Sequence, residues 1–121
     1  MYVQEVADLG VEVERGPGDT TVRLAGDLDK VTAPLLRQRL AELIAEGLVH
    51  LAIDAHHLDF CDSSGLWALV EHQRAVAGRG GSLRLFGVHG VLRRVLDVTG
   101  LTAVFDEVLP VEKAARSVAQ L

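Results

Sequence analysis

Two adjacent serines in the middle of the chain are the residues best placed to do chemistry. Ser63 and Ser64 follow Asp62 and precede Gly65, just after an apolar run and at the predicted start of a helix. A capping role alone would explain this block, because small hydroxyl and acidic residues are the usual N-caps of helices. A functional role would need an exposed hydroxyl. Phosphorylation would then add about −1.5 to −2 charge at a helix N-terminus, where an anion is favoured, and its effect would fall on a partner.

Other kinds of active site find little support in the sequence. The serines lack a Gly-x-Ser-x-Gly setting because position 61 is cysteine, and no phosphate loop or dinucleotide fingerprint is present. The histidines do not have the spacing of a zinc site. A phospho-receiver domain would need a lysine after a late strand, and neither Lys30 nor Lys113 is so placed. We therefore expect a protein that is not an enzyme and that binds no cofactor or metal.

Strands are predicted by short apolar or alternating runs. Residues 11–14 and 20–25 flank a Gly-Pro-Gly turn and predict a β-hairpin. The runs at 48–53 and 82–86 fit buried strands, and residues 102–105 predict a last short strand.

Helices are predicted between these strands. One begins with Thr32 as its N-cap and Pro34 in its first turn, a second begins near Ser63, and a third runs from about Val91 to Gly100. A final amphipathic helix is predicted to open at Pro110, with an inner face formed by Val111, Ala114, Ala115 and Val118. The alternation of strands and helices implies an α/β fold with helices packed on a mixed sheet.

Composition limits the possible partners. A length of 121 residues suits one domain over residues 1–121, in which residues 1–10 form either an extra strand or a loose arm. The net charge of −5 and the lack of a basic patch argue against direct nucleic-acid binding. The amino terminus does not resemble a signal peptide, and no apolar run could span a bilayer, so we expect a cytoplasmic protein without a membrane partner.

Several short segments together carry a family resemblance. They occur in a fixed order: residues 26–29 (Gly-Asp-Leu-Asp), 32–34 (Thr-Ala-Pro), 60–66 (Phe-Cys-Asp-Ser-Ser-Gly-Leu), 81–85 (Gly-Ser-Leu-Arg-Leu) and 96–101 (Leu-Asp-Val-Thr-Gly-Leu). In kind and spacing this set resembles the STAS anti-sigma factor antagonists, or anti-anti-sigma factors, over about residues 11–118. The resemblance implies a STAS-type mixed sheet of four to five strands with about four helices.

The resemblance also implies a function for the serines. In this family the serine directly after the aspartate is phosphorylated by an anti-sigma factor that is a Ser/Thr kinase, and by position that serine is Ser63. The unphosphorylated protein binds the kinase and releases a sigma factor, and a phosphatase resets the switch. The matching positions expected to bind the partner are Asp29, Asp62, Ser64, Gly65 and Trp67, although Asp29 could equally be a solvated loop residue.

Two departures from the family pattern leave alternatives open. Cys61 replaces an apolar residue, so it is either a small apolar side chain or a redox site. Trp67 replaces a small residue and is either a core filler or an exposed aromatic anchor. An alternative function is a STAS module that is not phosphorylated and serves as a scaffold or a subunit of a stress-signalling or transport complex. The sequence does not specify the sigma factor or the oligomeric state.

Overall fold

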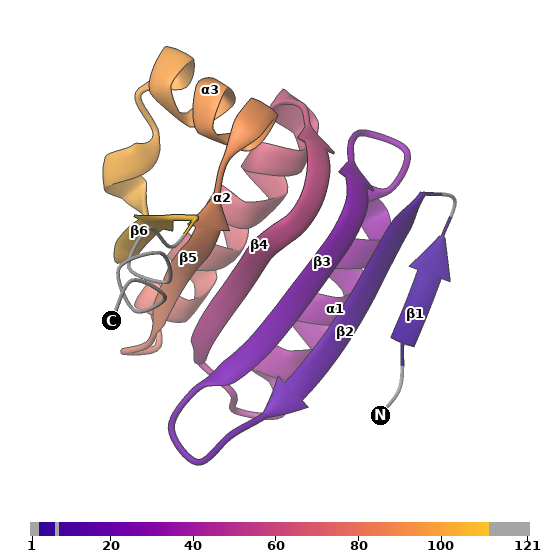
Figure 1. Ribbon diagram of the computed structural model, residues 1–121. Coiled ribbons are helices and arrows are strands. Elements are labelled where there is room, and N and C mark those ends of the chain that lie inside the picture. The colour runs from indigo at the N-terminus through magenta and orange to yellow at the C-terminus, as the bar shows by residue number, and fades with distance from the viewer. Residues whose placement is uncertain (1–2, 7, 112–121) are drawn as a thin grey trace, which may run out of the picture.

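A six-stranded mixed sheet runs through the described part of the chain, residues 3–6 and 8–111 of the computed structural model (Figure 1). The strands stand in chain order. Each of the first three pairs antiparallel with its neighbour, and the parallel pairs begin between the third and the fourth. The strands are β1 (Val3–Val6), β2 (Leu9–Arg15), β3 (Thr20–Leu28), β4 (His50–Cys61), β5 (Ser82–Val88) and β6 (Glu107–Pro110).

Two helices cover one face of this sheet. They are α1 (Ala33–Ala45) and α2 (Ser63–Ala77), which lie behind the strands in Figure 1 and are joined by an ion pair between Arg37 and Glu71 at 3.1 Å. A third helix, α3 (Gly90–Thr99), packs near the carboxyl end of β4 and is followed by a short 3₁₀ helix, η1 (Thr102–Val104). No helix within the described residues is long and apolar enough to cross a membrane.

The core between the helices and the sheet is aliphatic. On the inner face of α1, Leu36, Leu40 and Leu43 are fully buried. They meet strand residues such as Leu51 and Ile53 of β4, which are also fully buried. This packing explains why a chain with few aromatic residues can still exclude water from its interior.

The opposite face of the sheet carries cross-strand ion pairs. Arg23 of β3 pairs with Glu12 and Glu14 of β2 and lies 3.7 Å from Asp54 of β4. The Asp54 carboxylate also accepts a hydrogen bond from the backbone N–H of His56 at 3.0 Å and lies 2.6 Å from its ring Nδ1. Burial pushes the pKa of Asp54 up, but these hydrogen bonds and the Arg23 charge outweigh it, so the pKa lies below its usual 3.8.

The predicted fold class is confirmed, although the described sheet has six strands where four to five were expected, and the structure corrects further details. The hairpin is present, and β1 gives the lead-in segment a strand at the edge of the sheet. The strand predicted at 102–105 is wrong. This segment contains η1, and β6 follows it because Asp106 is fixed to β5 by two hydrogen bonds with the backbone of Leu83, at 2.7 and 3.1 Å.

The helix predicted to open at Pro110 does not begin there. Pro110 is the last residue of β6, at the edge of the sheet, where a residue without an N–H is tolerated. Val111 still donates its N–H to the Val88 carbonyl of β5, at 3.1 Å. The other predicted inner-face residues, Ala114, Ala115 and Val118, lie outside the described residues.

Candidate functional site

The two serines open α2 at the carboxyl end of β4. Asp62 has an extended backbone, and its carboxylate accepts the N–H of Gly65 at 2.9 Å. Of the three residues that could have capped the helix, Asp62 therefore does so. Neither serine hydroxyl is therefore needed as the N-cap of α2.

Ser63 is exposed as the first residue of α2, whereas Ser64 is half-buried. The first N–H groups of a helix have no partner within the helix, and they add to the positive end of the macrodipole. An anionic group on the Ser63 oxygen would therefore sit in a favourable local field.

The start of α2 is fixed against the end of β3. Asp62 donates its N–H to the carbonyl of Leu28 at 3.1 Å. Gly65 is buried directly against the same residue, and a Cβ at this position would lie 2.7 Å from the Leu28 carbonyl oxygen. Only glycine allows this approach, so Gly65 sets how closely the serine-bearing turn lies to β3.

Asp29 begins the β3–α1 loop, next to this contact. Its carboxylate accepts the N–H groups of Val31 at 2.9 Å and Thr32 at 3.0 Å, and its carbonyl accepts that of Ala33 at 2.7 Å. Thr32 occupies the N-cap position as predicted, but its buried hydroxyl bonds to the Asp27 carbonyl at 2.8 Å and does not cap the helix. The Asp29 carboxylate thus holds the entry to α1.

Trp67 lies one turn after Ser63 on the same side of α2. It is 42% exposed, so it is not a core filler, and the Arg74 guanidinium stacks over its ring at 5.8 Å. Of the two alternatives for this residue, the exposed aromatic is the one observed. The exposed serine and the exposed indole thus face the same surroundings.

Cys61 behaves as a small apolar residue. It is fully buried, and its thiol donates to the Asp62 carbonyl at 3.4 Å. Burial, with a smaller effect from the Asp62 charge, raises the pKa of Cys61 to about 12. The thiolate that redox chemistry requires is therefore scarce at neutral pH.

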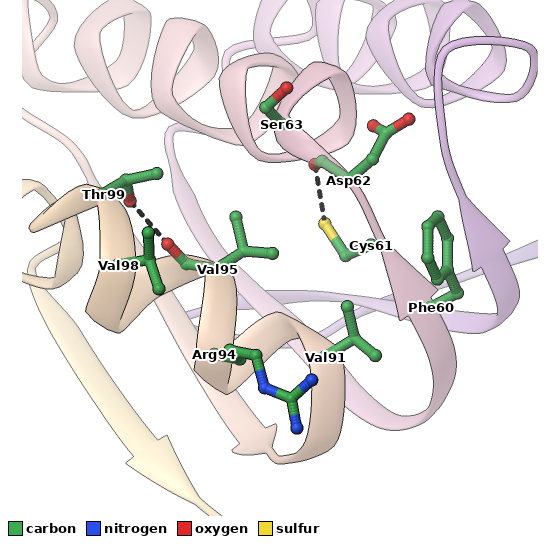
Figure 2. A pocket seen from close by; sticks show the side chains of 9 residues that line it. All are labelled: Phe60, Cys61, Asp62, Ser63, Val91, Arg94, Val95, Val98 and Thr99. Atoms are coloured by element: carbon green, nitrogen blue, oxygen red, sulfur yellow. Dashed lines mark hydrogen bonds between the residues drawn. The ribbon is translucent and has the colours of Figure 1, made fainter.

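A pocket that the sequence did not indicate lies beside Ser63. It has a volume of about 440 Å³ and lies between α3 and the junction of β4 with α2 (Figure 2). Its walls are formed by Phe60, Cys61, Asp62, Ser63, Val91, Arg94, Val95, Val98 and Thr99. The sequence held one indication of this pocket, because α3 has more apolar residues than its packing on the core uses. Of this helix, only Leu92 and Leu96 are buried.

Comparison with known proteins identifies the family. The family model of the STAS domain matches residues 10–119. The chain belongs to the STAS domain family. It is 34% identical over 99 residues to the anti-sigma-B factor antagonist of Bacillus subtilis. The alignment covers 82% of this chain and 90% of that protein.

Further relatives of the STAS chain carry similar names. It is 32% identical over 95 residues to the anti-sigma F factor antagonist of Paenibacillus polymyxa, covering 78% of this chain and 81% of that one. Among solved structures, an anti-sigma factor antagonist from Mycobacterium paratuberculosis superimposes with a TM-score of 0.75 at 27% identity, over 92% of each chain.

Proposed function

We propose that this STAS protein is an anti-sigma factor antagonist that is switched by phosphorylation of Ser63. In its unmodified form it binds an anti-sigma factor that is a Ser/Thr kinase, and the bound sigma factor is released. Phosphate on Ser63 ends this binding, and a phosphatase restores it. The observation that carries the proposal is the exposed Ser63 hydroxyl, free of any capping duty, in a chain whose curated relatives are named anti-sigma factor antagonists.

The proposed binding surface, here called the partner face, surrounds this hydroxyl. It joins the first turns of α2 to the β3–α1 loop, which the Leu28 contacts hold together. Its members are Asp29, Val31, Asp62, Ser63, Ser64 and Trp67. Gly65 is buried beneath it and contributes by fixing the height of the first turn.

Two exposed apolar side chains give the partner face its binding energy. Trp67 is 42% exposed and Val31 is 66% exposed. A partly exposed tryptophan that is ordered by its helix and by Arg74 is the kind of residue that forms an interface hot spot. The Asp29 carboxylate is already engaged with backbone N–H groups, so it would present the Val31 side chain in a fixed position.

Phosphorylation would act on the complex rather than on the fold. The added dianion would sit next to the Asp62 carboxylate, in the centre of a surface that fits a neutral hydroxyl. Reversing a complex from mostly bound to mostly free requires about 5 kcal/mol. A hydrated dianion held against a closed interface, together with repulsion from any acidic partner group, is large enough to supply it.

The kinase would supply ATP and Mg²⁺, so the STAS chain itself needs no cofactor. The test is to incubate the purified chain with each anti-sigma factor kinase of its source organism and Mg-ATP, and then to map modified peptides by mass spectrometry. We expect one phosphate, located on Ser63, present in a Ser64→Ala control and absent from Ser63→Ala. Absence of phosphate from every reaction would refute the switch and favour an unmodified scaffold module.

A further inference from the structure

The pocket between α3 and the start of α2 is an apolar surface that the protein's own core does not fill. Val91 and Val95 extend from α3 toward Cys61, and Val98 lies beside them (Figure 2). Val98 is 80% exposed, and Phe60 on the other side of the pocket is 40% exposed. Such neighbouring exposed apolar side chains mark an interaction site more often than a single one does.

One edge of the pocket carries the positive charge of an arginine. Arg94 lines the pocket, and it forms no ion pair with any residue that the structure describes. The adjacent Arg93, by contrast, lies 3.6 Å from the Asp97 carboxylate one turn later. An occupant of the pocket would therefore be recognised by an apolar group for the floor and a carboxylate for Arg94.

The pocket is continuous with the partner face. Asp62, the N-cap of α2, and Ser63, its first residue, both belong to the pocket wall (Figure 2). A protein docked over the Ser63 hydroxyl must therefore also cover the pocket mouth. Because the pocket is wide and open rather than enclosed, it suits a side chain presented by a protein surface better than a small free ligand.

We propose that this pocket receives an apolar side chain of the anti-sigma factor, followed by an acidic residue of the same protein that pairs with Arg94. The inference rests on the proposed function and adds a second anchor, on α3, to the contacts made by α2. It also identifies a contact that phosphate on Ser63 would disrupt. A dianion on Ser63 stands at the edge of the pocket and keeps that apolar contact hydrated.

The test uses cysteine protection in the full chain, because the native Cys61 is buried with a raised pKa and is expected to react slowly with alkylating reagents. The variants are Val98→Cys at the pocket and, as a matched control, Leu109→Cys on β6, where the native side chain is 43% exposed. We expect the anti-sigma factor that binds the unmodified chain to slow maleimide labelling of Val98→Cys about tenfold or more. Labelling of Leu109→Cys should stay unchanged.

A charge reversal tests the acidic half of the proposal. Arg94→Glu should raise the Kd for the same anti-sigma factor about 30-fold, as loss of a hot spot does, whereas Arg93→Glu should change it less than about threefold despite the same change in net charge.

The outcomes separate this inference from the proposed function. If the anti-sigma factor binds and Ser63→Asp weakens binding, but Val98→Cys is labelled as fast in the complex as alone, the pocket is not the contact and only this inference fails. Protection that appears without the anti-sigma factor, and grows with chain concentration, would assign the pocket to a second copy and overturn it too. If no anti-sigma factor binds the unmodified chain, both proposals fail together.

Discussion

The substitution Gly65→Ala should change the free energy of unfolding through two effects of opposite sign. Within a helix, replacing glycine by alanine stabilises by about 1 kcal/mol, because alanine loses less conformational entropy. At Gly65, however, the new Cβ would lie 2.6 Å from Leu28 Cγ and 2.7 Å from the Leu28 carbonyl oxygen. Contacts this short require one of the two elements to move.

Moving the Leu28 carbonyl away from the new Cβ would cost free energy. This carbonyl accepts the Asp62 N–H at 3.1 Å, so moving it away lengthens the hydrogen bond that joins β3 to the start of α2, worth about 1 kcal/mol. Overpacking in a well-filled interior adds about 1–3 kcal/mol. After subtracting the helix propensity gain, we predict that Gly65→Ala lowers the free energy of unfolding by about 2 kcal/mol.

Urea unfolding followed by circular dichroism measures this difference. The control is Gly78→Ala at the other end of the same helix, where φ is −65° and the new Cβ would come no closer than 3.5 Å to any neighbour. This variant should be neutral or more stable by up to about 1 kcal/mol. If Gly65→Ala were as stable as Gly78→Ala, the close packing of the serine-bearing turn on β3 would be wrong.

Three further predictions concern single side chains. The Cys61 thiol, with a pKa of about 12, should resist iodoacetamide at pH 8 in the folded protein and react on unfolding in urea; rapid reaction of the native protein would contradict its burial. Because the pKa of Asp54 is lower in the folded state, its stabilisation is complete above pH 3.8 and is lost as the pH falls below it. The difference in free energy of unfolding between wild type and Asp54→Asn should thus become smaller in acid. A difference that grows as the pH falls would contradict the lowered pKa of Asp54. Asp29→Ala should lower the free energy of unfolding by about 1 kcal/mol, and Asp29→Asn by less, as urea titrations of both would show; equal losses would argue against a capping role.

The sequence predicted the site better at its centre than at its surroundings. Asp62 as a cap and Ser63 as the first helical residue follow from local chemistry, which a sequence displays directly. The capping role of Asp29 was not foreseen, because Thr32 has an equally suitable side chain and only the packed structure shows that its hydroxyl is turned inward. The pocket was missed because it exists only where α3 meets β4.

The strands illustrate the same limit. The central strand was predicted for 48–53, yet β4 extends to Cys61. Two register shifts between β3 and β4 break the alternation of buried and exposed residues in its second half, so that Ala55, Leu58 and Cys61 are buried at a spacing of three. A search for apolar residues at every second position does not find a strand with this spacing. At the other end, the pairing of β6 depends on Asp106 and Leu83, which are far apart in the sequence.

The central claim is that the charge state of Ser63 decides whether the partner face binds an anti-sigma factor. The most direct measurement is a calorimetric titration of the anti-sigma factor into four forms of the chain: unmodified, phosphorylated on Ser63, Ser63→Ala and Ser63→Asp. The account predicts tight binding by the unmodified and Ser63→Ala forms. It predicts binding weakened several thousandfold by phosphate, equivalent to about 5 kcal/mol, and weakened to a smaller extent by Ser63→Asp. Equal affinity for the phosphorylated and unmodified forms would contradict it.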